Sequence, residues 1–364
     1  MSVTSSSVEP RTALPANEPL RAILQSGILA PSADNRHHFR FELSADHVAL
    51  VSTDTSTWVA QPHRRMLGLV SYGAVLENMA LRAAQLGLAQ ATRWMPDTAR
   101  ADLIAECRWT AAPAVEEPLA AAIDERHSNR RFFRRRSLDA ALLARLAAAA
   151  GAVPGATLLW LDDPDRRRVA LQALRIAETE RFCRPALHQE LFGAVRFDAG
   201  WHAGTTLGLP PGALEVEPPM RPAFAALRRW PLMHALTRIG MHHLLGLRAA
   251  DLPCRLAPHL GLIVCDLADP RLAALYAGRA LERVWLAATA ARLALQPMAA
   301  ASALVHQRAG GGWVAPAAQR RLIERLDRLT DGRPRAAFMF VRVGRAAPPS
   351  VTAGRPPLDQ FLTR

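Results

Sequence analysis

Apolar residues recur at helical spacing in some segments of this chain and alternate with polar residues in others. From Leu20 to Ala30 they repeat every three to four residues, which predicts a helix that ends at Pro31. Residues 39–43 alternate between apolar and polar side chains, and residues 47–52 form a second short apolar run, so we expect a pair of strands. A longer helix is expected over residues 71–88.

The same order of elements is predicted again in the second half of the chain. Ser137 can cap a helix, and Asp163-Pro164 is typical of a helix start because a capping carboxylate precedes a proline at the first helical position. The expected elements are helices over residues 138–150, 164–182 and 277–295, and strands over residues 157–161 and 259–266.

A gapless internal repeat accompanies this repeated order. Residues 73–89 align with residues 278–294, and the glycine that opens each segment is among the identical positions, as is a glutamate four residues later. Coincidence between two helices rich in Ala and Leu is the alternative. Because the neighbouring elements repeat as well, we interpret the chain as a tandem duplication.

Composition favours a helical or mixed protein over an all-β one. The chain has 364 residues, of which 50% are apolar and only 6% aromatic, which is enough for one large or two medium domains. Four cysteines lie far apart, and no histidine or cysteine spacing is typical of a metal site, so we expect reduced thiols and no metal. No apolar run is long enough to span a membrane, and we expect a cytoplasmic protein with no membrane partner.

The net charge of +13 comes from arginine alone, because the sequence contains no lysine. Clustered arginine is the usual sign of a nucleic-acid surface, and the densest run spans residues 126–136. No zinc-finger spacing, basic zipper or RNA-recognition signature accompanies it. We therefore expect no nucleic-acid partner and interpret the other arginines as solvated helix faces.

Two short motifs carry the candidate chemistry. One is Pro31-Ser32-Ala33-Asp34-Asn35, and the other is Arg126-His127-Ser128-Asn129-Arg130. Taken singly, the first is also compatible with an ordinary helix-stopping turn and the second with a solvated basic loop. In the second motif, two guanidinium groups and a hydroxyl lie on one loop, and this combination is suited to binding a phosphate.

In combination these motifs resemble the FMN-binding elements of the nitroreductase family. In that family the Arg-x-Ser-x-Arg/Lys element precedes the Pro-Ser-x-x-Asn element, whereas here their order is reversed and the gap is wider. The resemblance therefore implies an α+β, nitroreductase-like fold in which two tandem half-domains mimic the family homodimer and share one flavin site. Single-chain proteins of the Acg-type subgroup have this plan, with a lid.

The resemblance also implies a role for each matching residue. Arg126, Ser128 and Arg130 would bind the phosphate and ribityl chain, and residues of the other half would contact the flavin from the opposite side. Two backbone N–H groups would face flavin N5, and one arginine near the C-terminus would reach the phosphate. Pro31, Ser32 and Asn35 are the residues that would contact the flavin from the opposite side. Ala299 and Ala300 would supply the N–H groups, and Arg355 is the arginine near the C-terminus. No side chain is expected to act as a catalytic acid or base.

Two departures from the family pattern stand out. The family continues Pro-Ser-x-x-Asn with Gln-Pro-Trp, where this chain has His37-His38-Phe39. A basic residue usually lies two positions before the last phosphate arginine, and here Ala353 takes its place. Both changes fall on expected flavin contacts, so they are compatible with weaker binding or an altered substrate face.

The expected organisation places a disordered arm at residues 1–17, a first half at 18–118, a second half at 119–345 and a tail at 346–364. The second half carries a proline-rich insertion at about 215–255, which we interpret as a lid. The implied function is an FMN-binding oxidoreductase that uses NAD(P)H to reduce a small electrophilic or aromatic acceptor. A flavin-sequestering, stress-related protein with little turnover is the alternative. Fused halves remove the need for a dimer, so we expect a monomer.

Overall fold

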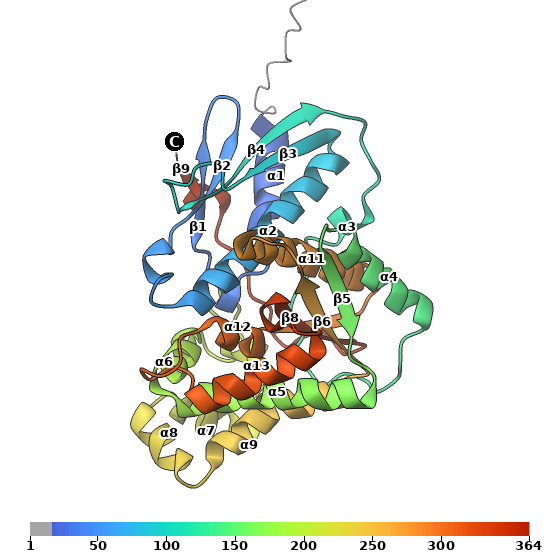
Figure 1. The fold of residues 1–364 in the computed structure, drawn as a ribbon. Helices are drawn as coiled ribbons and strands as arrows, with labels where there is room; N and C mark the ends of the chain where they lie inside the picture. The colour runs from blue at the N-terminus through green and yellow to red at the C-terminus, as the bar shows by residue number, and fades with distance from the viewer. Residues whose placement is uncertain (1–16, 364) are drawn as a thin grey trace, which may run out of the picture.

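The computed structural model describes residues 17–363 and contains two sheets with a layer of helices between them (Figure 1). The first sheet has the strand order β3-β4-β2-β1-β9, and the second has the order β5-β6-β8-β7. All strand neighbours are antiparallel except β1 and β9. The strands are β1 (Phe39–Leu43), β2 (Val48–Ser52), β3 (Leu88–Trp94), β4 (Leu103–Ala111), β5 (Ala156–Trp160), β6 (His259–Cys265), β7 (Ala294–Met298), β8 (Ala337–Gly344) and β9 (Leu362–Thr363).

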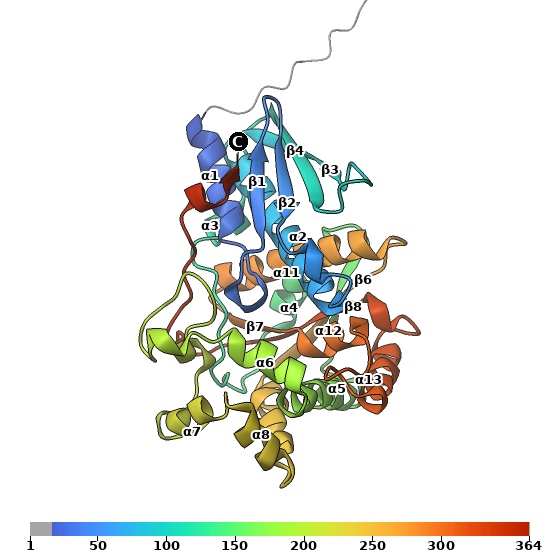
Figure 2. The same cartoon turned by 90° about the vertical axis from the view of Figure 1, so that its left-hand side faces the viewer.

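The helices fall into three groups. Four lie between the sheets or beside them: α1 (Asn17–Ile28), α2 (Pro62–Gln85), α4 (Ala140–Gly151) and α11 (Pro270–Ala290), with the single turn α3 (Pro118–Ala121) against α2 and α11. Four cover the far side of the second sheet or extend from it: α5 (Pro164–Cys183), α6 (Pro185–Gly193), α12 (Ala300–His306) and α13 (Pro316–Leu329). The insertion contributes α7 (Arg221–Ala226), α8 (Trp230–Thr237), α9 (Met241–Gly246) and α10 (Leu252–Leu256) at the end of the molecule opposite the first sheet (Figures 1 and 2).

The two sheets differ in how they are covered. Every residue of β6 and β8 is buried, because helices pack on both faces of the second sheet. In the first sheet β3 alternates half-buried and exposed residues, which is the pattern of a strand with one solvated face. The main hydrophobic core lies between the two sheets and includes α1, α2, α4 and α11.

Helices α2 and α11 have the most extensive helix–helix contact among the described residues, and two glycines make their close approach possible. A Cβ atom at Gly73 would overlap the carbonyl oxygen of Leu275, and one at Gly278 would overlap the carbonyl oxygen of Val70. The contact is reciprocal, since each glycine lies against the residue three positions before the other. Both glycines are paired in the internal repeat, so the aligned segments meet each other in space.

The mixed helix and sheet content is confirmed. Strand β1 has the expected bounds, β2 and β6 differ from expectation by one residue at one end, and β5 is shifted by one residue at both ends. Asp163 caps α5 as predicted, because its side chain accepts hydrogen bonds from the backbone N–H groups of Asp165 and Arg166. Of the arm expected over residues 1–17, all but Asn17 lies outside the described residues.

Several expected boundaries are wrong. Helix α2 begins nine residues before the predicted Ser71, at Pro62, and α11 covers Pro270–Ala290 instead of residues 277–295. Arg292 takes a left-handed φ of 57°, which ends that helical path and lets residues 294–298 form β7. The cap of α4 is Asp139 and not Ser137, because the Asp139 carboxylate accepts from the Leu142 N–H at 2.8 Å.

The insertion and the tail also differ from the sequence expectation. The insertion contains an apolar run at residues 230–247 whose composition suits one helix, but Gly240 at φ 81° separates it into α8 and α9. The tail returns across the molecule along α1 to the first sheet, where β9 pairs in parallel with β1 and the Phe361 carbonyl accepts from the Phe41 N–H at 2.7 Å (Figure 2).

Candidate functional site

A cavity of about 1180 Å³ lies where the layer of helices meets the insertion. This is larger than the ~300–1,000 Å³ of most ligand pockets. Its wall combines segments far apart in the sequence: α2, the loop at residues 123–130, α5 and α6, the insertion, and the tail at residues 351–355. All nine residues nominated from the sequence line this cavity, so the fold brings both motifs to one place.

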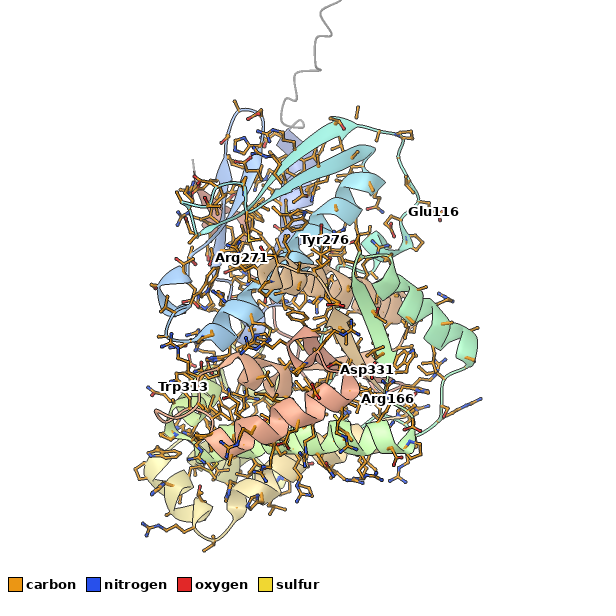
Figure 3. The ribbon with its side chains drawn as sticks, in the orientation of Figure 1. Glu116, Arg166, Arg271, Tyr276, Trp313 and Asp331 are labelled. Carbon is orange, nitrogen blue, oxygen red and sulfur yellow. The ribbon has the colours of Figure 1, made fainter. Side chains whose placement is uncertain are left out.

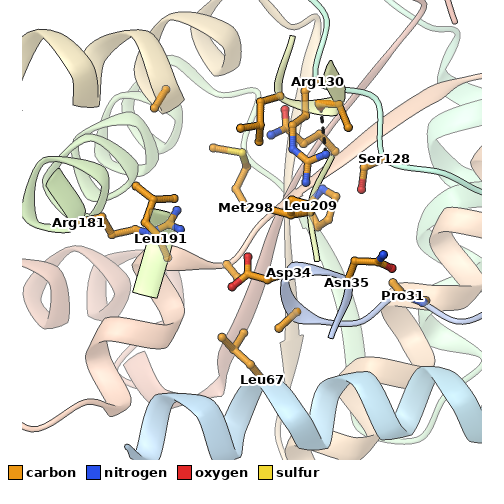
Figure 4. Close-up of a pocket in the computed structure, with 18 of the residues that line it drawn as sticks. Pro31, Asp34, Asn35, Leu67, Ser128, Arg130, Arg181, Leu191, Leu209 and Met298 are labelled. Carbon is orange, nitrogen blue, oxygen red and sulfur yellow. Dashed lines mark hydrogen bonds between the residues drawn. The ribbon is translucent and has the colours of Figure 1, made fainter. Parts of the chain in front are cut away.

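The loop that carries Arg126, Ser128 and Arg130 supplies the most available donors. Arg130 is half-buried, and its guanidinium makes one hydrogen bond, from Nη1 to the Ala213 carbonyl at 3.3 Å (Figure 4). Within residues 17–363 it has no carboxylate in ion-pair range, and Ser128 Oγ makes no hydrogen bond. A guanidinium has five N–H donors, so Arg130 has four left for a ligand.

Arg126 is more deeply buried than Arg130 and is held by the protein itself. Its Nη2 donates to the Leu29 carbonyl at 2.9 Å, its Nε lies 3.4 Å from Glu282 Oε1, and its guanidinium lies 4.5 Å from the ring centre of Trp285. Burial lowers the pKa of Arg126, and the Glu282 carboxyl opposes that effect. Arg126 can therefore supply positive potential to the cavity from a fixed position.

The second motif follows α1 and contains two consecutive left-handed residues. Asp34 has φ 57° and Asn35 has φ 54°, conformations that Asp and Asn adopt more readily than most residues. The Asn35 amide donates to the carbonyls of Gly208 and Thr205 at 3.1 and 3.4 Å and accepts from Arg355 Nη1 at 2.7 Å. Asn35 thus joins the tail to the loop at residues 205–208.

Arg355 is likewise bound mainly to the protein. Its guanidinium donates to the carbonyls of Ile28, Ala30 and Gly354 as well as to Asn35. Burial, with Arg126 nearby, lowers the pKa of Arg355. Four of its five donors are in use, so it holds the turn at residues 28–35 in place and has one N–H left for a ligand.

The remaining nominated residues lie at the junction of β7 and α12. Ala299 precedes α12 and Ala300 is its first residue. The first N–H groups of a helix have no partner within the helix, so backbone donors are available here without any side-chain requirement. Pro31 and Ser32 complete the wall, and Ser32 Oγ lies 3.3 Å from His37 Nδ1.

Two cavity residues that sequence reasoning did not single out have distinctive surroundings. The Asp34 carboxyl points into the cavity with no hydrogen bond to residues 17–363, and burial raises its pKa, while Arg181 opposes that effect (Figure 4). Trp285 covers Arg126 and donates from Nε1 to the His127 carbonyl at 3.3 Å. Asp34 lies inside a motif that we had identified, so its position was the one available signal.

A second group of charged residues lines the end of the cavity beside α6. His63 Nε2 lies 3.0 Å from Glu190 Oε2, and Arg181 donates to Glu178 at 2.9 Å. Burial acts to raise the pKa of Glu190, but the hydrogen bond and charge of His63 and the guanidinium of Arg64 outweigh it and leave that pKa lowered. These groups are paired with one another, in contrast to Arg130.

Comparison with known proteins gave matches to solved structures only, since neither a family model nor a curated protein matches the chain. A putative nitroreductase in complex with FMN from Desulfovibrio desulfuricans is 15% identical, with a TM-score of 0.36 over 69% of this chain and 98% of that one. The FMN-dependent nitroreductase NfnB from Mycobacterium smegmatis, in complex with NADPH, is 16% identical, with a TM-score of 0.39 over 68% and 97%. A nitroreductase with bound FMN from Desulfitobacterium hafniense is 16% identical, with a TM-score of 0.36 over 69% and 99%.

Among residues 17–363 no cluster of three His, Cys, Asp or Glu side chains could hold a metal ion, and no helix is long and apolar enough to cross a bilayer. The four cysteines are free, and burial raises the pKa of Cys107, Cys254 and Cys265 to about 12.

Proposed function

We propose that this chain binds FMN in the cavity and acts as an NAD(P)H-dependent oxidoreductase of nitroreductase type. The observation that carries the proposal is Arg130, a half-buried guanidinium that faces a large cavity beside Ser128. Among residues 17–363 this guanidinium has one backbone partner, and the Ser128 hydroxyl has none. An arginine in that state favours an anionic ligand with several acceptor oxygens, such as a phosphate. Bound FMN would supply hydride transfer between NAD(P)H and a small electrophilic or aromatic acceptor.

The protein's own contribution is binding, orientation and electrostatics. Arg126 and Arg130 place fixed positive charge on one wall, and the start of α12 adds backbone donors. The apolar residues of α5, α6 and the insertion exclude water from the opposite wall. No side chain is assigned as a catalytic acid or base.

We further propose that the chain consists of two nitroreductase-like halves, at residues 18–118 and 119–345. Three features support a duplication: the gapless repeat at 73–89 and 278–294, the equal strand order β1-β2-β4-β3 and β5-β6-β8-β7, and the reciprocal glycine contacts of α2 and α11. Each half would supply one motif to the single cavity. A monomer is then sufficient for function.

Flavin sequestration is the second candidate function, with the insertion at about 215–255 acting as a lid. The cavity wall includes Phe224, Leu236 and Leu245 from this insertion, so a bound flavin would be covered on that side. The commitment of Arg355 and Asn35 to protein partners, with Ala353 in place of a basic residue, also leaves fewer ligand contacts than the family pattern.

A visible spectrum of the full chain with added FMN, followed by anaerobic NADPH and NADH, separates these candidates. A bound-flavin spectrum that bleaches supports the oxidoreductase. A bound flavin that stays yellow with both donors supports sequestration. The absence of flavin binding would overturn both.

The residue assignment is tested by replacing the available donors. Arg130→Ala combined with Ser128→Ala should weaken FMN binding by at least tenfold, since a hydrogen bond to a charged group contributes roughly 1.5–3 kcal/mol. Adding Arg126→Ala should abolish FMN retention on gel filtration. Arg135→Ala is the matched control, because Arg135 is exposed in the same run and has no ion pair within the described residues. Full FMN occupancy in this triple variant would contradict the assignment.

A further inference from the structure

The outer surface of the insertion combines positive charge with exposed apolar side chains. Residues 218–250 contain five arginines and three histidines but no aspartate or glutamate. Of the nine large apolar side chains that are exposed among residues 17–363, four belong to this segment of 33 residues. They are Met220, Leu232, Ile239 and Leu244, at 55%, 39%, 76% and 59% exposure.

Three of the five arginines lack a carboxylate partner. Arg228, Arg229 and Arg238 are exposed, and none has an ion pair within the described residues, although the Arg228 guanidinium lies 5.5 Å from the ring centre of Phe197. Elsewhere in the chain surface arginines are commonly paired, as in Arg196 with Asp198 and Arg271 with Asp269. The charge of these three arginines is therefore not compensated by an ion pair in the described residues, whereas Arg248 is paired with Glu217.

Apolar and basic residues occupy the same short helices. On α8 the exposed residues include Leu232 and, just beyond the helix, Arg238 and Ile239, while Met233 points inward and is fully buried. Helices α7, α8 and α9 lie together at the end of the molecule opposite the first sheet (Figures 1 and 2). An exposed leucine and isoleucine between arginines suit the boundary between lipid headgroups and acyl chains.

We propose that the outer face of α7–α9 docks on the surface of a bilayer that contains anionic lipids. Arginine side chains would contact the headgroup phosphates, and Leu232 and Ile239 would enter the outer edge of the acyl region. A second copy of this chain is disfavoured as the occupant, because like charges would meet across the contact. This inference replaces the expectation of no membrane partner, which rested on the absence of a spanning run.

The cavity opens next to this face. Met220 and Leu244 are exposed and also line the cavity, so the apolar surface of the insertion continues into it. Docking would bring the mouth of the cavity to the lipid surface, where apolar molecules concentrate. The docking itself does not depend on the proposed flavin chemistry and is tested without it.

The test is flotation of the full chain with vesicles of phosphatidylcholine, alone or mixed with phosphatidylglycerol, at physiological salt. We expect binding to the anionic vesicles only. Arg228→Gln, Arg229→Gln and Arg238→Gln together should weaken it on the order of a hundredfold, because each basic residue near an anionic surface contributes about a factor of five. Ile239→Ser with Leu232→Ser should weaken binding several-fold while leaving the charge unchanged.

A matched control removes three charges from another face. Arg320, Arg321 and Arg328 on α13 are exposed and without ion pairs in the described residues, so their replacement by Gln changes net charge equally. Binding of that variant should stay within a few-fold of the parent. No binding to anionic vesicles, equal binding to phosphatidylcholine alone, or equal loss in both triple variants would overturn the proposal. Binding of double-stranded DNA instead of vesicles, lost in the insertion variant, would point to a nucleic-acid surface and overturn it as well.

Discussion

At the scale of single residues, Glu282 is a buried acid whose surroundings compensate poorly for a negative charge. Its carboxyl is fully buried, and neither oxygen has a hydrogen-bond partner with good geometry among residues 17–363, although Arg126 Nε lies 3.4 Å away. Burial raises the pKa of Glu282 from 4.5 to about 7, and Arg126 opposes that effect. Its counterpart in the repeat, Glu77, is paired at 2.7 and 2.6 Å with Arg279 and Arg283.

The raised pKa of Glu282 makes stability depend on pH in a defined direction. Below about pH 4.5 the group is protonated in both folded and unfolded chains and has no effect. As the pH rises from about 4.5 to 7 the unfolded chain loses the proton first, so folding stability falls by up to about 3 kcal/mol and then levels off. Glu282→Gln should remove this fall. In urea unfolding, the unfolding free energy of the variant should therefore rise relative to that of the parent between pH 5 and pH 8.

Glu77→Gln is the control for that experiment. It should destabilise the fold at neutral pH, because two half-buried guanidinium groups lose their carboxylate partner. If the unfolding free energies of Glu282→Gln and the parent differed by the same amount at every pH, Glu282 would ionise normally.

At the scale of elements, the tight packing of α2 against α11 stabilises the helix layer between the sheets. Gly73→Ala or Gly278→Ala should each cost roughly 1–3 kcal/mol of unfolding free energy, because the added methyl group meets backbone that cannot rotate away. Gly151→Ala at the end of α4 is the matched control, since nothing lies within 4 Å of the new methyl group. Equal stability of Gly73→Ala and Gly151→Ala in denaturant titrations would contradict the tight crossing.

Elements with a strong local signal were predictable, and those fixed by distant contacts were not. The alternation Phe39-Arg40-Phe41-Glu42-Leu43 gave β1 correctly because one face of that strand is buried. Strand β3 went unpredicted because only small or polar residues lie between Leu88 and Trp94. Strand β9 has two residues and exists only through pairing with β1, which no local pattern shows.

The candidate site was predictable to the level of its members but not of their contacts. Both motifs reach the cavity, yet no sequence pattern indicated that Asn35 and Arg355 would bind each other at 2.7 Å. The sequence also did not indicate the roles of Asp34 and Trp285 in the cavity wall. The main charged groups around Asp34 and the guanidinium over Trp285 belong to segments more than 90 residues away.

At the scale of the whole molecule, the proposed duplication leaves a second position equivalent to the cavity. Continuing the repeat in register pairs Ser71 with Tyr276 and Ala299 with Trp94. Ser71 and Ala299 line the cavity. Trp94 and Tyr276 instead pack together, with ring centres 5.3 Å apart, under the guanidinium of Arg279. Tyr276 is labelled on α11 in Figure 3. The equivalent position is filled by side chains.

Binding stoichiometry follows from this asymmetry. Titration with FMN should saturate at one flavin per chain, measured as the ratio of flavin to protein absorbance after gel filtration. Trp94→Ala should leave that ratio at one, because the opposite position has no counterpart of the Arg126–Arg130 motif. Two flavins per chain in either protein would contradict the single site.

The path of the tail sets the order in which the molecule can be completed during synthesis. Arg355 fastens the turn at residues 28–35, and β9 closes the edge of the first sheet beside β1. Strand β1 and the first motif are therefore synthesised more than 300 residues before these partners. The wall of the cavity is therefore incomplete in a nascent chain until Arg355 has left the ribosome.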